Sequence, residues 1–346
     1  MKNKKLPVAF AALLLIITLF IFGESFSSGI RKGLYSCSNI IIPSLFPFMV
    51  ASSLAALGDL PEIIKKIIDK PMRKIFSMPA ECFPAILLGT VGGYPVGAKT
   101  ASTLYASGKI NSTQAKRLLL FCVNSGAGFA INALGSGILM SRQSGKLVFI
   151  SGCLASVITG VISCAVPQNG ERILPARENS LSFSKAVVDS VASAATGILY
   201  VCGFVCVFSG ISEIIMSLPI NENIKNIVIC ILEVTNGCSA SAKLLPLPVV
   251  SAVTAFGGLC VHMQVFALSD NFQPGIPLFY LFRIIHSVFA ALICKILLFF
   301  FPAASEVFLT FSENAAPWSF SAPSAISLLF LSALLILDLD TDKKIC

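Results

Sequence analysis

The chain has 346 residues, of which 55% are hydrophobic and 12% charged, with 25 Lys and Arg residues against 17 Asp and Glu. Soluble domains carry about 25% charged residues, so this composition excludes an ordinary soluble enzyme and a disordered chain. The positive balance fits basic loops at one membrane face better than nucleic-acid binding, because no basic stripe is interleaved with aromatic residues. We therefore expect a polytopic, all-α integral membrane protein whose surroundings are the lipid bilayer.

The first apolar run, residues 6–22, follows a basic N-terminus and is not followed by a small-residue cleavage site, which predicts an uncleaved first span. The run at residues 61–70 places pairs of isoleucines between charges and predicts a short helix on the membrane surface, with a partner-binding helix as the alternative. A bilayer needs roughly 20 apolar residues per span. Continuous spans of that kind are expected at residues 34–57, 118–140, 147–166, 187–216, 247–268, 278–301 and 321–337.

Two further apolar segments, residues 83–106 and 227–245, have glycine-rich middles and carry Lys99 and Lys243. Glycine and proline at that density break a helix, and freed backbone groups persist at membrane depth only where protein or a cavity covers them. We expect re-entrant hairpins or broken helices there, with full crossing as the alternative. If both hairpins return to their own face and both termini are cytoplasmic, sixteen Lys and Arg lie inside, five outside and four within apolar segments, as the positive-inside rule requires.

The order span, broken hairpin, glycine-bearing span and further span occurs twice, starting from opposite faces. This order predicts two inverted-topology repeats, an arrangement that many secondary transporters use. The expected divisions are an N-terminal anchor at 1–33, a first repeat at 34–166, a cytoplasmic linker at 167–186, a second repeat at 187–301, and a C-terminal helix and tail at 302–346.

Four sequence blocks resemble a known family: residues 92–99 (GGYPVGAK), 108–120 (GKINSTQAKRLLL), 121–129 (FCVNSGAGF) and 256–264 (FGGLCVHMQ). They are similar to the sporulation integral membrane proteins of the YlbJ type, which carry the nucleoside-recognition, or gate, domain shared with nucleoside transporters. The resemblance covers roughly residues 34–300. Two positions depart from the family pattern: Gly92 stands where a serine is expected, which removes a hydroxyl ligand, and Ala127 where a proline is more usual.

The resemblance implies that both repeats are gate-like and that the protein exports dipicolinic acid from the mother cell toward the developing spore. It also implies a location in the mother-cell or outer forespore membrane. The residues themselves support a coarser expectation, a transporter or permease for a small anionic, ring-bearing metabolite. A non-transporting scaffold of spore assembly and a nucleoside-type permease are the alternatives, and a homo-oligomer is an open expectation.

The candidate substrate site gathers polar residues and glycine from the two hairpins and the glycine-bearing spans. An ionisable group within a span is a functional candidate. Lys99 is expected to bind the anion, the alternative being that it snorkels to the interface, and Tyr94 to stack on its ring. Three roles are expected for Glu233 as alternatives: it pairs with a hairpin lysine, it carries a coupling proton, or it holds the hairpins together. The complete set is Gly93, Tyr94, Pro95, Lys99, Asn124, Ser125, Glu233, Asn236, His262 and Gln264.

Other patterns favour structural explanations. The stretch from Gly92 to Thr100 differs by one residue from a phosphate-binding loop and no strand precedes it, so ATP binding is not expected. Arg283 and Lys295, near the two ends of one apolar run, are expected to snorkel. The 12 cysteines include no CxxC pair, and the two histidines form no catalytic or metal-binding set, so we expect no enzyme activity, cofactor or metal.

Overall fold

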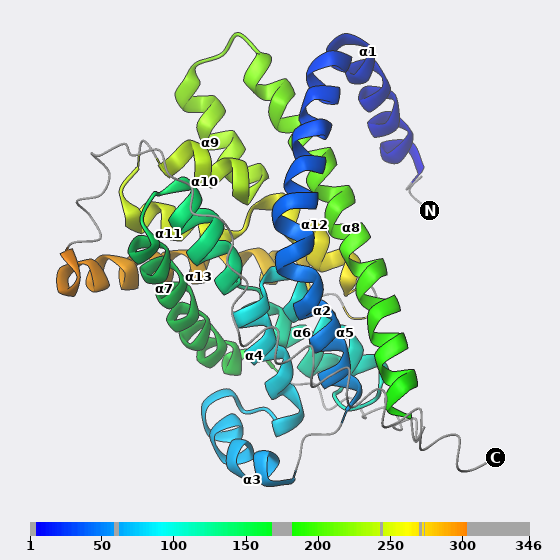
Figure 1. The fold of residues 1–346 in the computed structure, drawn as a ribbon, viewed down its shortest axis with the longest axis vertical. Helices are drawn as coiled ribbons and strands as arrows, with labels where there is room; N and C mark the ends of the chain where they lie inside the picture. Colours follow the sequence, from blue (N-terminus) through cyan, green and yellow to red (C-terminus); the bar gives the residue numbers. More distant parts are fainter. Residues whose placement is uncertain are drawn as a thin grey trace.

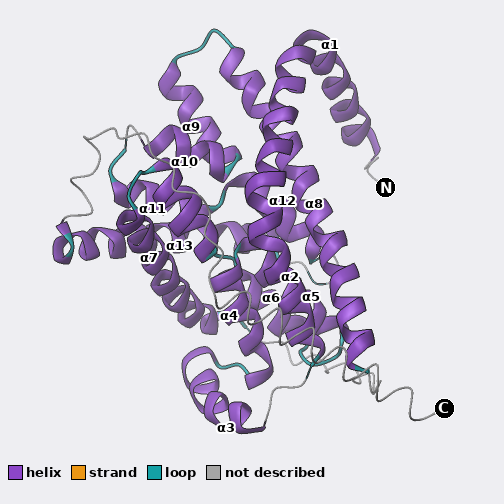
Figure 2. Ribbon diagram, in the orientation of Figure 1, coloured by secondary structure: helices purple, strands orange, loops and turns teal. Residues whose placement is uncertain are grey.

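The computed structural model describes residues 5–58, 62–167, 182–242, 245–269, 272 and 274–302. Within these ranges every regular element is a helix (Figure 2). Five helical segments are long and apolar enough to cross a membrane, or six if one bent pair counts as a span. The prediction of a polytopic all-α membrane protein is confirmed. The expected span at 321–337, Lys243 and most of the 167–186 linker lie outside the described residues.

The first two expected spans form one long, bent helical segment. It consists of α1 (Lys5–Ser36), the π-helical turn η1 (Cys37–Ile41) and α2 (Ile42–Leu57). The helix bends at Phe22, and the part after the bend runs along α8 (Phe183–Ser217) (Figure 1). A Cβ on Gly29 would lie 2.4 Å from the carbonyl oxygen of Ser209, so glycine is what allows these two helices to approach.

The predicted surface helix is present as α3 (Glu62–Pro71), continued by the π-helical turn η2 (Met72–Phe76). Ile63 and Ile67 remain 75% and 68% exposed, as expected for an apolar helix face that lies on lipid. The chain then turns through 88° into the short turn η3 (Ala80–Cys82) and the helix α4 (Phe83–Gly92).

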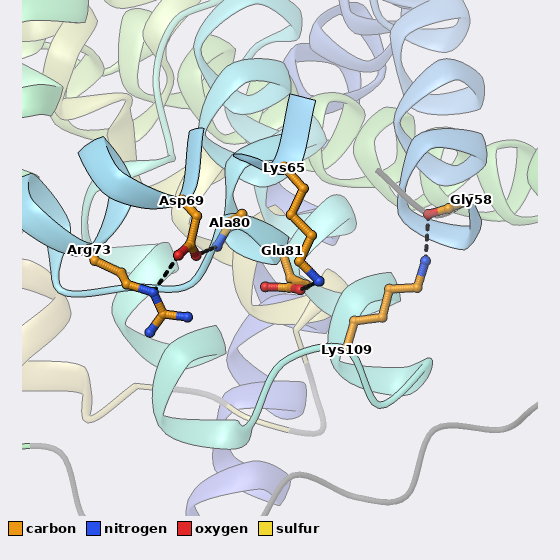
Figure 3. A network of polar contacts seen from close by, with 7 residues as sticks. All are labelled: Gly58, Lys65, Asp69, Arg73, Ala80, Glu81 and Lys109. Atoms are coloured by element: carbon orange, nitrogen blue, oxygen red, sulfur yellow. Dashed lines mark hydrogen bonds and ion pairs between the residues drawn. The ribbon is translucent and has the colours of Figure 1, made fainter. Parts of the chain in front are cut away.

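A network of polar contacts holds α3 against η3 (Figure 3). Lys65 forms an ion pair with Glu81 at 2.8 Å, and Asp69 accepts hydrogen bonds from Arg73 at 2.7 Å and from the Ala80 backbone N–H at 3.3 Å. The hydrogen bond from Arg73 lowers the pKa of the Asp69 carboxyl. The contact is therefore present at neutral pH and is lost only as the pH falls through that lowered pKa.

The two segments with glycine-rich middles are broken, as predicted. The first comprises α4 (Phe83–Gly92) and α5 (Tyr94–Ala106), and the second α9 (Glu222–Leu232) and α10 (Val234–Ala242). After α5, Lys109 donates to the carbonyl oxygens of Leu57 and Gly58 at the end of α2, close to Lys65 (Figure 3). The α4–α5 pair therefore begins and ends at the same end of the molecule, as a hairpin does.

Two spans that the sequence predicts as continuous are also broken. Residues 118–140 contain the end of α6 (Ser112–Phe121) and the π-helix η4 (Gly128–Ile138). Residues 247–268 contain α11 (Leu247–Phe256) and α12 (Gly258–Leu268). Residues 247–268 remain long and apolar enough to cross a membrane despite the break, so the predicted span is confirmed there. The prediction of a continuous span was wrong for 118–140, because apolarity alone does not keep a helix continuous. Asn124 and Ser125 favour non-helical backbone, and Gly257 and Gly258 adopt φ of +87° and +76°.

The remaining described helices are α7 (Arg142–Ile162), the short turn η5 (Ser163–Ala165) and α13 (Ile276–Phe300). Polar contacts join α7, α11 and α13: the ring of His286 bonds the Gly152 carbonyl at 3.1 Å, and Ser151 bonds Ser251 at 2.8 Å. The order hairpin, broken pair and long helix thus occurs in each half of the chain. The inverted relation between the halves stays a prediction.

Candidate functional site

The tip of the first hairpin packs on the break that follows it in the chain. A Cβ added to Gly89 or to Gly97 would lie 2.2 Å from the carbonyl oxygen of Cys122, so both helices of the hairpin approach this one oxygen. The hairpin turns at Gly93, whose φ of +115° is open to glycine but strained for other residues. Gly126 in turn lies against the backbone of this tip, since its Cβ would be 2.8 Å from the Gly93 nitrogen.

The second hairpin has the same relation to its own following break. α9 and α10 meet where a Cβ on Gly237 would lie 2.7 Å from the Cα of Cys230. At the break between them a Cβ on Gly258, which begins α12, would lie 3.1 Å from the Leu232 carbonyl oxygen. In both halves, therefore, a hairpin tip contacts a glycine in the next broken helix pair.

Glu233 occupies the break of the second hairpin and is 3% exposed. Its two carboxylate oxygens accept backbone hydrogen bonds from Thr235 at 3.0 Å and Asn236 at 2.7 Å, which begin α10. The carboxylate therefore satisfies N–H groups left free at a helix N-terminus and lies at the positive end of the helix dipole. No ion pair joins Glu233 to Lys99 within the described chain, and Lys243 lies outside it.

Tyr94 links the two halves. It is 6% exposed, its hydroxyl donates to the carbonyl oxygen of Thr254 in α11, and its ring lies 3.3 Å from where a Cβ of Gly257 would be. Ser125 is buried next to Gly126, whose Cβ would lie 2.8 Å from the nitrogen of Gly93, the residue before Tyr94. A Cβ on Gly258, the neighbour of Gly257, would lie 3.2 Å from the Glu233 nitrogen, so the second hairpin break is beside this contact. The first hairpin and the α11–α12 break thus meet in one buried polar cluster.

Arg283 contributes a positive charge that the sequence assigned to the membrane interface. It is fully buried on α13 and donates to the carbonyl oxygens of Leu120 and Val123, where α6 ends. Its guanidinium also lies 5.8 Å from the centre of the Phe279 ring. The snorkelling prediction was wrong for Arg283, because these unpaired carbonyls offer it an internal partner. Lys295, on the same helix, is exposed as expected.

Three other predicted residues are buried with local partners. Asn124 donates to Phe121 and Ser156, the ring of His262 bonds the Phe256 carbonyl at 2.9 Å, and Gln264 contacts the sulfur of Cys260 at 3.3 Å. Within the described structure, Oδ1 of Asn124 and Nδ1 of His262 have no hydrogen-bond partner. A buried polar atom without a partner is costly, so both atoms are available to a ligand that reaches them.

Lys99 lies apart from this cluster in the described interactions. It is half-buried on α5, and its ammonium has no hydrogen-bond or ion-pair partner among the described residues. Pro95 is buried in the first turn of α5, and Asn236 takes part through its backbone N–H. The structure thus brings together Gly93, Tyr94 and Ser125 and places Glu233 beside Gly258, next to the glycine that contacts Tyr94. It also adds Arg283, which the sequence analysis assigned to the interface.

Replacement of Glu233 by alanine should destabilise the fold. Loss of a helix cap costs about 1 kcal/mol, within a range of roughly 0.5 to 2, and two buried N–H groups would lose their acceptor. Glu233→Gln should have an intermediate effect, since it retains one oxygen and turns an amide toward the second N–H. A thiol-reactive dye measures unfolding directly, because the thiols of Cys82, Cys122 and Cys260 are buried and form no disulfide.

The matched control is Asp189→Ala, which removes an exposed carboxylate from α8. Its unfolding midpoint should equal that of the wild type, since substitutions at exposed sites usually change stability by less than about 0.5 kcal/mol. If Glu233→Ala unfolds at the wild-type temperature, the carboxylate does not stabilise the second hairpin.

Comparison with known proteins adds a relative. The chain is 22% identical over 341 aligned residues to the sporulation integral membrane protein YlbJ of Bacillus subtilis, and the alignment covers 86% of this chain and 83% of the relative. The resemblance to the YlbJ-type proteins is confirmed. It supports the assignment of this chain as an integral, multi-pass membrane protein. No family model matches the chain, and no solved structure matches it. The gate-domain part of the resemblance stays a prediction.

Proposed function

We propose that this chain is a membrane transporter or permease for a small anionic metabolite, with dipicolinate as the candidate substrate. The observation that carries the proposal is the buried cluster formed by two hairpin tips and two broken helix pairs, with Tyr94 joining the halves. Lipid-facing helices need no breaks. Backbone that leaves the helix inside a bilayer is tolerated where it lines a cavity or is covered by protein, which is the setting of transport sites.

The charges in and near the cluster favour an anion. Arg283 is buried without an acidic partner among the described residues, and Lys99 is half-buried without any. The N-terminus of α5 at Gly93 adds a positive dipole end. A neutral nucleoside would need neither cation, so a nucleoside-type permease is the weaker proposal.

Movement of one half against the other would expose the cluster to alternate faces. The close glycine contacts keep each hairpin with its own following helix pair. Hydrogen bonds of Tyr94, Arg283, Ser151 and His286 join the two halves. Each hairpin is thus suited to move together with its helix pair, and such a movement would break the hydrogen bond from Tyr94 to Thr254. The ring of Tyr94, once freed, is suited to stack on an aromatic substrate.

Purified protein in liposomes tests the proposal. Proteoliposomes should accumulate labelled dipicolinate, whereas labelled uridine should not accumulate above the level of empty liposomes. Accumulation of uridine alone would favour the nucleoside-type permease. If neither accumulates while the protein is inserted and folded, and spores lacking the protein keep normal dipicolinate content, the scaffolding alternative replaces transport.

A further inference from the structure

A pocket of about 160 Å³ lies outside the cluster, between α6, the segment after η5 and the start of α13. A cavity of about 150 Å³ holds a benzene molecule, so this pocket is large enough for one small ring or a phosphate group. Four lining residues are spaced to share one face of α6. The described lining consists of Thr113, Lys116, Arg117, Leu120, Val166, Pro167, Pro274, Gly275 and Leu278.

Arg117 is a buried cation whose hydrogen-bonding capacity is only partly used. It is 1% exposed, and its Nη2 donates to the Phe76 carbonyl at 2.8 Å and to the Ser163 hydroxyl at 3.3 Å. Its Nε and Nη1 have no hydrogen-bond partner in the described part of the chain. Buried guanidinium groups are normally paired with acids, and Arg117 both lines this pocket and keeps two donors without a partner, so an acceptor is missing beside it.

The other polar groups of the pocket have the same sign. Lys116 is half-buried beside Arg117, and Gly275 caps the N-terminus of α13, a helix of 25 residues whose dipole is positive at this end. None of the described lining residues is acidic. Leu120 and Leu278 provide apolar walls.

We propose that this pocket binds the carboxylate or phosphate group of a small anion, held by Arg117 and Lys116, with its apolar part against Leu120 and Leu278. Leu120 also connects the pocket to the cluster, because its carbonyl oxygen accepts a hydrogen bond from Arg283. The pocket is then the first binding site of the transported anion, a role that rests on the proposed function. The same anionic chemistry occurs in the phosphate of a lipid headgroup, which the experiment distinguishes.

Calorimetric titration of the purified full chain in detergent tests the pocket. The probes are dipicolinate, benzoate, inorganic phosphate and short-chain phosphatidylglycerol. We expect at least one probe to bind the wild type, and Arg117→Gln and Lys116→Gln each to weaken that binding about tenfold or more, as the loss of a charge-assisted hydrogen bond predicts. Lys66→Gln removes an exposed lysine from α3 and should leave the affinity unchanged.

The outcomes separate the pocket from other sites. Lys116→Gln provides the test if Arg117→Gln, which also loses the contact with Phe76, fails to fold. Binding of phosphatidylglycerol alone, weakened by the same variants, assigns the pocket to a lipid phosphate and supports the anion chemistry. Absence of binding by every probe, or equal affinity in the wild type and both folded variants, overturns the proposal. Binding is measured without transport, so a chain that binds here but accumulates no substrate refutes the transport proposal alone.

Discussion

The substitution Gly97→Val should prevent the chain from folding. A Cβ at Gly97 would lie 2.2 Å from the Cys122 carbonyl oxygen and 3.0 Å from the Cα of Gly89, and both obstacles are backbone atoms. Neither can rotate away as a side chain does, so the hairpin would have to leave the break on which it packs. Overpacking a well-packed core typically costs about 1–3 kcal/mol, and a clash with backbone on two sides belongs at or above the upper end.

The measurement is the yield of monodisperse protein in detergent, followed by dye-detected unfolding of any material recovered. Gly203→Val is the matched control, because nothing lies within 4 Å of a Cβ at that position in α8. We expect near wild-type yield for the control and little or no folded protein for Gly97→Val. Equal yields and midpoints for the two variants would mean that the hairpin tip does not pack on Cys122.

The sequence was sufficient to predict the class of fold and the two hairpins. Long apolar runs predict spans because of bilayer thickness, and clustered Gly and Pro predict breaks because such residues do not sustain a helix. Those signals are local, so they can be recognised without knowing what each segment contacts. The break at Gly93, between α4 and α5, and the break at Glu233, between α9 and α10, follow this rule.

The break inside 118–140 is different. Its sequence is apolar enough to span a membrane, and the helix ends at Phe121 because the chain beyond it meets other segments: Gly126 at the first hairpin tip and Arg283 at the Leu120 and Val123 carbonyls. Arg283 is 160 residues away from Val123 in sequence. Asn124 and Ser125 favour a break locally, but neither contact can be read from the sequence. The same reason explains why Arg283 was assigned to the interface instead of the interior.

The candidate site was predictable in part. Tyr94, Ser125 and Glu233 could be selected because polar residues within apolar segments are unusual. Their partners could not, since the acceptor of Tyr94 is the backbone oxygen of Thr254 and the donors to Glu233 are backbone N–H groups. A backbone partner has no residue identity to read from the sequence.

Lys99→Ala should abolish dipicolinate accumulation without preventing membrane insertion. A dicarboxylate that leaves water must exchange its hydration for hydrogen-bond donors and at least one positive charge, because an uncompensated buried ion is very costly. Lys99 is the formal positive charge of the first hairpin, and its ammonium is unpaired within the described residues, so its removal breaks no described contact. The fold should therefore survive the substitution while the first hairpin loses its positive charge.

Two further variants make the uptake measurement specific. Lys99→Arg should retain part of the activity, since the charge is kept while the planar guanidinium is bulkier than an ammonium group. Lys295→Ala removes an exposed lysine from the apolar helix α13 and should transport like the wild type. Dipicolinate uptake into proteoliposomes is compared at equal amounts of inserted protein. If Lys99→Ala accumulates as much dipicolinate as Lys295→Ala and the wild type, the lysine only reaches toward the membrane interface, and the anion must rely on the buried guanidinium of Arg283 and on helix N-termini for its positive charge.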